Sequence, residues 1–136
     1  MKRTIVFALG LFLCAACCGD GEKLEVPPLP KDGAAIPYGQ VLTRLAAQTN
    51  AAKEEHFLNR WDGLVDSTVS LDQSAVYLMR SADLPALHKA SIEKSSEEMK
   101  GNIAKLREAA RRKDQTESLD LIRRIHNQIR EMQELK

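Results

Sequence analysis

From residue 38 to the C-terminus, apolar residues recur in alternating steps of three and four, and this period constrains the fold more than any other feature. An α-helix turns once every 3.6 residues, so these steps place the apolar side chains on one face. We expect helices over residues 38–57 and 61–79, from after Asp83 to about Lys113, and from Asp114 to the C-terminal end. The expected buried faces are Tyr38, Leu42, Leu45, Thr49, Ala52 and His56; Trp61, Leu64, Thr68, Leu71, Ala75 and Leu78; Ile92, Met99, Ile103, Leu106 and Ala110; and Leu119, Ile122, Ile125, Ile129 and Met132.

Local signals favour helices at these positions. Aromatic residues are only 4 % of the chain, and the straight-chain residues and alanine that dominate this part lose little rotamer freedom in a helix. Asp83 is expected to cap the third helix, and Asp114 with Glu117 comes close to a capping box for the fourth. The polar run 48–50 makes the first helix the least regular. Four amphipathic helices with short connections predict an all-α, antiparallel four-helix bundle.

The first 18 residues predict a lipoprotein-type signal peptide with its anchor site. Lys2 and Arg3 precede an apolar run, residues 5–16, which is too short to span a hydrocarbon core of about 30 Å. Two alanines then precede Cys17, the residue that we expect to carry lipid. Cys14 stands where a leucine or valine is usual, so cleavage near residue 19 by the general signal peptidase is the alternative.

Residues 19–37 predict a flexible Pro/Gly-rich tether, since they hold four of the five prolines. Residues 38–136 then form the bundle domain. We expect an exported protein, anchored in a membrane of the bacterial cell envelope and facing the periplasm. Because Cys18, and not an aspartate, follows the lipidated position, the outer membrane is favoured.

The residues of the predicted domain contain no recognisable catalytic or metal-binding motif. All three cysteines lie at or before residue 18, and His56, His88 and His126 fall on three different expected helices. No pair therefore has metal-ligand spacing within a helix, and a half-buried or capping role is expected for each histidine. The formal net charge of +1 does not favour a nucleic-acid partner. We expect no enzyme, no metal and no cofactor.

Basic residues gather around the connection between the third and fourth helices. Acidic residues are interleaved with them, so most of this charge is expected to be ordinary solvated surface. A docking patch for an acidic partner or a lipid headgroup is the alternative. The basic residues are Arg107, Arg111, Arg112, Lys113, Arg123, Arg124 and Arg130.

The run from Leu106 to Asp114, followed by Leu119, Ile122, Ile125 and Arg130, resembles the last two helices of the cytochrome c′-like family, which shares its bundle with soluble b-type cytochromes. In that family the final helix carries Cys-x-x-Cys-His, which binds haem covalently. The corresponding positions here are Ile129, Met132 and Gln133. The resemblance therefore implies a haem-less member, in which His126 and Met132 are weak candidates for holding a displaced haem.

These observations predict a non-enzymatic exported lipoprotein that acts as an interaction or structural protein of the cell envelope. Its expected partners are a membrane, through the N-terminal lipid, and an envelope protein of unknown identity. A homodimer is a further expectation, because members of the resembling family dimerise through their first two helices. The alternative function is a periplasmic haem- or metal-binding carrier that uses His126.

Overall fold

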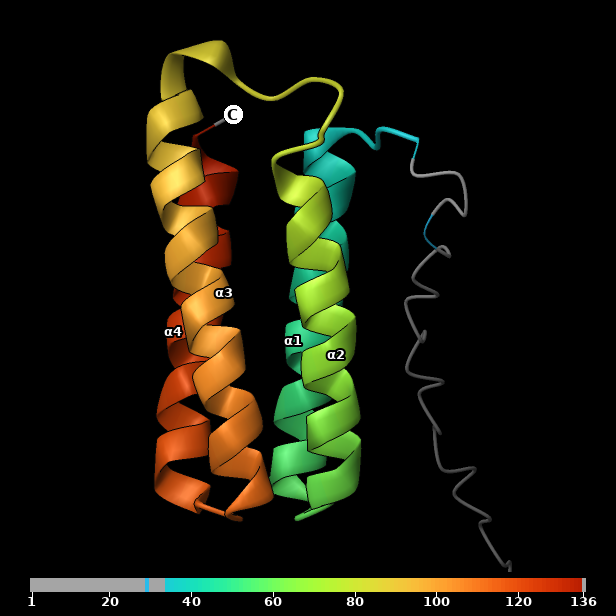
Figure 1. Ribbon diagram of the computed structural model, residues 1–136, viewed down its shortest axis with the longest axis vertical. Coiled ribbons are helices and arrows are strands. Elements are labelled where there is room, and N and C mark those ends of the chain that lie inside the picture. Colours follow the sequence, from blue (N-terminus) through green and yellow to red (C-terminus); the bar gives the residue numbers. More distant parts are fainter. Residues whose placement is uncertain (1–28, 30–33, 136) are drawn as a thin grey trace, which may run out of the picture.

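The computed structural model describes residue 29 and residues 34–135, and almost all of the second range is helical (Figure 1). The expected signal peptide, Cys17 and most of the expected tether lie outside the described residues. Consecutive helices run antiparallel, and the chain forms the four-helix bundle that the apolar period predicts. The helices are α1 (Tyr38–Phe57), α2 (Trp61–Leu78), the short 3-10 helix η1 (Ala86–His88), α3 (Lys89–Arg111) and α4 (Gln115–Glu134).

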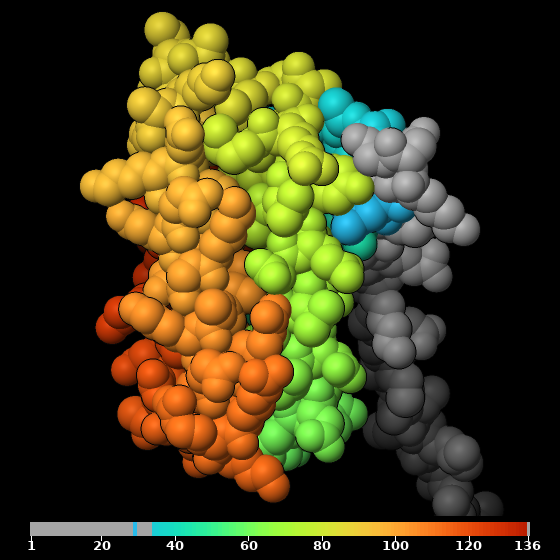
Figure 2. All heavy atoms as spheres, viewed as in Figure 1, coloured from blue at the N-terminus to red at the C-terminus, as the bar shows by residue number. Residues whose placement is uncertain are grey.

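The four long helices form a ring in which each packs against two others. Helix α1 contacts α2 and α4, and α3 contacts the same two helices. The space between the two hairpins in the ribbon drawing is filled by side chains, as Figure 2 shows on the α2/α3 face. Among the described residues, no helix is both long and apolar enough to cross a membrane.

The predicted apolar faces are the buried faces of the bundle. Only Trp61 and Leu119 among the predicted residues are half-buried. The structure adds buried residues that the period did not predict: Val41, Ser74, Ser96, Ala109, Ser118 and Leu121. The polar run in α1 does not interrupt the helix, and the hydroxyl of buried Thr49 is satisfied by donating to the carbonyl oxygen of Leu45 at 2.8 Å.

At one end of the bundle, which we call the turn end, residues 58–60 and 112–114 connect the helices of each hairpin. Asp114 caps α4 as expected, since its Oδ1 accepts from the backbone N–H of Glu117 at 2.9 Å. The Glu117 carboxylate does not complete a capping box, because it pairs with Arg112 instead. The boundary of α4 was therefore predictable from two residues close in sequence.

At the other end, which we call the crossover end, the expected role of Asp83 is wrong. Asp83 does not cap the third helix; its Oδ1 accepts from the backbone N–H of Tyr38 at the start of α1. The third helical segment begins instead with η1, directly after Pro85, and continues as α3. The first N–H groups of a helix have no partner within it. The fold places the Asp83 carboxylate beside the first N–H groups of α1, so it accepts a hydrogen bond there.

Candidate functional site

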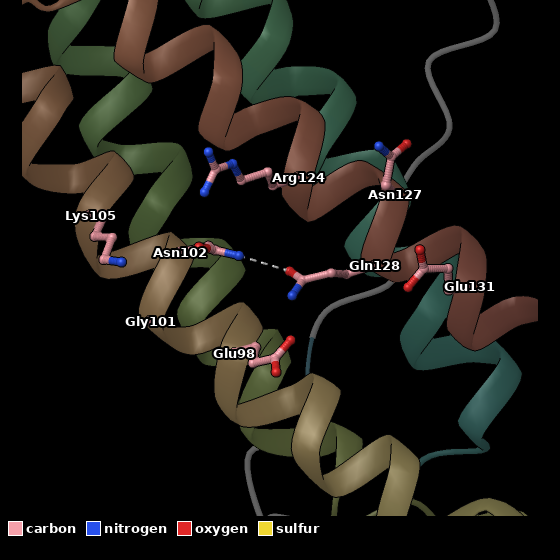
Figure 3. Close-up of a pocket in the computed structure, with 8 residues that line it drawn as sticks. All are labelled: Glu98, Gly101, Asn102, Lys105, Arg124, Asn127, Gln128 and Glu131. Carbon is pink, nitrogen blue, oxygen red and sulfur yellow. Dashed lines mark hydrogen bonds between the residues drawn. The ribbon is translucent and has the colours of Figure 1, made fainter.

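A hollow in the described surface lies between the outer faces of α3 and α4 (Figure 3). Its volume is about 540 Å³, and all of the side chains that line it are polar or charged, apart from one glycine. The lining residues are Glu98, Gly101, Asn102, Lys105, Arg124, Asn127, Gln128 and Glu131. We call this hollow the α3/α4 groove.

The α3/α4 groove is closed across its centre by a pair of amides. The side-chain amide of Asn102 donates to Oε1 of Gln128 at 3.1 Å, which joins the two helices in the middle of the hollow (Figure 3). An amide carries both donors and an acceptor. Each of these two side chains therefore has further hydrogen-bonding capacity for a molecule in the groove.

Charge is sorted along the groove on either side of this amide pair. Figure 3 shows Glu98 and Glu131 on one side of it, and Lys105 and Arg124 on the other. Within each helix the two charges are seven residues apart, which is two turns or about 10 Å. The groove therefore has an acidic end, an amide centre and a basic end, and its formal charges cancel.

Most of these charges are not neutralised inside the domain. Among the described residues, Lys105, Arg124 and Glu131 take part in none of the ion pairs that the structure contains. Glu98 meets Lys94 at 4.0 Å, with 57 % and 81 % of their side chains exposed. An exposed pair at that distance contributes little. The four charges of the groove are thus available to a partner.

Gly101 opens the backbone of α3 at the centre of the groove. A Cβ atom added there would meet no atom within 4 Å, and the residue is exposed. In contrast, a Cβ on Gly63 would lie 2.3 Å from Oε2 of Glu55, so that flexible side chain would have to move to admit it. Glycine in the interior of a helix costs about 0.5–1 kcal/mol relative to alanine. No contact within the fold explains a glycine at position 101.

A second groove lies on the other side of α4, against α1, and it contains His126. Its volume is about 360 Å³. Leu119 and Ile122 supply apolar surface, and Lys53, Arg123 and His126 supply basic groups around it. We call it the α1/α4 groove.

The structure does not bring His126 and Met132 together. His126 is exposed, whereas the Met132 side chain is fully buried in the core. Ile129, the other residue at a haem-attachment position of the resembling family, is also buried, and Gln133 is half-buried. Met132 therefore cannot serve as a second ligand to a group held by His126 without repacking of the core.

The other two histidines lie far apart in the fold. His56 is buried at the turn end, where its Nε2 lies 2.9 Å from the carbonyl oxygen of Gln115 and its ring meets Trp61 edge-on. His88 is half-buried in η1, at the crossover end. No three potential metal-ligating side chains come together in the part of the chain that the structure describes.

Much of the basic surface predicted around the α3–α4 turn is paired locally. Arg111 pairs with Glu108, and Arg112 pairs with Glu117. Arg107 is half-buried, donating through Nε to the hydroxyl of Thr68 at 3.0 Å and lying 3.4 Å from Asp72. Arg107 thus links α3 to α2, whereas Lys113, Arg124 and Arg130 are exposed and belong to no ion pair among the described residues. The basic docking patch stays a prediction.

Sequence reasoning missed Gly101 and the amide pair as parts of a site. One signal could have found them: in an antiparallel hairpin, residues at equal distances from the turn lie side by side. Asn102 lies 10 residues before the 112–114 turn and Gln128 lies 14 residues after it, so this rule places them within about one helical turn of each other; for the acidic and the basic pair the two distances differ by three residues.

Comparison of the chain with protein-family models, with curated proteins and with solved structures found no match.

Proposed function

We propose that this protein is a non-enzymatic interaction protein of the bacterial cell envelope, exported and tethered to a membrane through lipid on Cys17. The α3/α4 groove is its binding surface. The observation that carries this proposal is the arrangement of the groove: four exposed charges, three of them outside the ion pairs of the described residues, stand in a fixed order around an amide bridge, beside a helix backbone left open at Gly101. Such an arrangement favours a partner with ordered polar groups, because register is set by charge complementarity.

Crosslinking from inside the groove tests this proposal. A photoreactive amino acid replaces Glu131 in the full chain, which is expressed in bacterial cells and irradiated. We expect a discrete protein adduct from this position, because Glu131 lines the groove. The matched control carries the same amino acid at Gln73, an exposed position on α2, and should give no such adduct. Equal adducts from both positions, or none from Glu131, would overturn the assignment of the groove.

The tether has its own test. A Cys17→Ser variant of the full chain is expected to lose the lipid and to move from the membrane fraction to the soluble extract, or to accumulate as precursor. Two acyl chains give stable anchoring, so the shift should be nearly complete. The measurement is cell fractionation with mass spectrometry of the N-terminal peptide. A processed variant that stays fully with the membrane would show that protein contacts, and not lipid, hold it there.

A haem or metal carrier is the second candidate, and the α1/α4 groove is the observation that favours it. His126 is exposed there beside the apolar side chains of Leu119 and Ile122. Haemin titration of the full chain in mild detergent tests the idea. Saturable one-to-one binding that disappears in His126→Ala, but persists in His88→Ala, would support it. Binding that is absent, or unchanged in His126→Ala, would exclude a haem carrier that uses His126.

A further inference from the structure

We infer that the partner in the α3/α4 groove is a second copy of this chain. This inference rests on the proposed function, since it names the occupant of the same groove. The argument comes from the order of the charges. Two carboxylates lie at one end of the groove and two cations at the other. The groove is therefore complementary in charge to a second copy of itself turned end for end.

Most homodimers have a two-fold axis, so the same patch is used by both copies. For two grooves that meet face to face, the axis lies in the plane of contact, and its two limiting directions are along the helices and across them. An axis along the helices would place acidic end against acidic end. An axis across the helices reverses one groove, so Glu98 faces the second copy's Lys105, and Glu131 faces the second copy's Arg124. Electrostatics therefore select the antiparallel arrangement.

The centre of the groove fits this arrangement as well. With the axis across the helices, α3 lies over the second copy's α3, and Gly101 comes close to its own symmetry mate. The missing Cβ allows the two backbones to approach there, since no atom lies within 4 Å of its position. The amides of Asn102 and Gln128 meet their own copies, and amides are self-complementary because each both donates and accepts.

The dimer is expected to be weak and sensitive to salt. A standard stable interface buries about 800 Å² per partner and has an apolar centre, whereas this groove is polar and narrow. Exposed ion pairs are screened by salt. Anchoring both copies in one membrane would raise their effective concentration, so weak affinity is compatible with a function at a surface.

Charge reversal provides the test, read by sedimentation equilibrium of the full chain in mild detergent at low salt. Lys105→Glu with Arg124→Glu makes the groove wholly acidic, and Glu98→Lys with Glu131→Lys makes it wholly basic. We expect the wild-type chain to dimerise, and each double variant alone to have a dissociation constant raised at least tenfold. An equimolar mixture of the two variants should dimerise again, because every pair across the interface is then attractive.

The control variant carries Lys53→Glu and Arg130→Glu, two exposed positions outside the α3/α4 groove. It changes the net charge by the same amount as Lys105→Glu with Arg124→Glu. It should keep the wild-type dissociation constant. Circular dichroism checks that each variant is folded. We expect folded variants because the exchanged side chains lie at the surface. Gly101→Ala should weaken the dimer severalfold while leaving the fold intact.

A monomeric wild-type chain, double variants that dimerise normally, or a mixture that stays monomeric would overturn the inference. The crosslinking experiment tests the proposed function separately from self-association. An adduct from position 131 with the mass of two chains supports both proposals, an adduct with a different protein supports the groove but overturns self-association, and no adduct overturns both.

Discussion

The two ends of the bundle are built by different means. At the turn end, the hydrogen bonds that end α1 are repeated at the end of α3. Asn59 N–H bonds to the carbonyl of His56 at 3.0 Å, and Lys113 N–H bonds to that of Ala110 at 3.0 Å. In each turn the next N–H reaches back five residues, from residue 60 to 55 and from 114 to 109. These are Schellman motifs, in which one residue adopts a positive φ.

At the crossover end, the contacts join segments that are far apart in the sequence. Asp83 accepts from the N–H of Tyr38, and the N–H of Ala82 donates to the carbonyl of Ile36 at 3.1 Å. The Tyr38 hydroxyl donates to the carbonyl of Met132 at 3.1 Å, near the end of α4. Carbonyls in the last turn of a helix have no partner within it, so Tyr38 links the start of α1 to the end of α4.

This difference shows where sequence rules hold. A turn of three residues has few conformations, so its chemistry can be read locally. The 79–88 connection is long enough for its polar groups to bond with whichever helix end the fold brings near. Substitutions at the two ends therefore test this difference.

The largest effect is expected from Tyr38→Ala at the crossover end. Tyr38 is only 2 % exposed, so truncation leaves a cavity and should cost about 3–5 kcal/mol of unfolding free energy. Tyr38→Phe keeps the ring and should cost about 1 kcal/mol, the net value of one hydrogen bond. Urea unfolding followed by circular dichroism measures both. If Tyr38→Ala were no worse than Tyr38→Phe, the ring would not be part of the core.

The next effect depends on pH. Burial raises the pKa of Tyr38 to about 12, against about 10 in the unfolded chain. The folded state therefore holds this proton more tightly, so its contribution is complete below pH 10 and is lost as the pH rises from 10 to 12. A shift of two units corresponds to a loss of about 2–3 kcal/mol.

Tyr38→Phe is the control for that alkaline loss, because other groups also titrate in this range. The variant should be less stable than the wild type near neutral pH, and the difference should shrink and then change sign between pH 10 and 12, because the alkaline loss of the wild type exceeds the cost of removing the hydroxyl. Urea unfolding at several pH values measures it. A difference that stays constant with pH would contradict burial of the phenol.

Removing one aspartate cap at each end should have a smaller effect. Asp114→Ala and Asp83→Ala each remove a carboxylate from the N–H groups of a helix start, and each should cost about 1 kcal/mol. The two losses should add, because the sites lie at opposite ends of the bundle. In a double-mutant cycle with Tyr38→Phe, a coupling is expected for Asp83→Ala and none for Asp114→Ala. Equal coupling for both would remove the distinction between the ends.

The smallest effect is a gain at the turn end. Lys113 has a φ of 57° and Asn59 a φ of 55°. Lysine pays a steric cost in that region, so Lys113→Gly should stabilise the domain by about 0.5–1 kcal/mol. Asparagine tolerates a positive φ, so Asn59→Gly should change stability little. Thermal unfolding of both variants compares them, and a destabilising Lys113→Gly would mean that the lysine side chain makes a compensating contact.

The candidate site, like the two ends of the bundle, has features that the sequence predicts and features that it does not. Its charged residues stand in the sequence as ordinary members of helix surfaces, and their spacing within each helix does not set them apart from the paired residues around them. Arg124 and Arg123 are adjacent, yet Arg123 pairs with Asp120 while Arg124 lines the α3/α4 groove. His126 was a predicted residue, but its separation from Met132 follows from the position of each on α4 relative to the core.

The four helices, most of their buried residues and the cap at Asp114 could be predicted from the sequence, because helix period and turn chemistry act over three to five residues. Three contacts follow from the packing of the folded chain alone: Asp83 with the start of α1, Tyr38 with Met132, and Asn102 with Gln128. These contacts span 26 to 94 residues of sequence. Their partners are selected by the packing of whole helices, which no local pattern encodes.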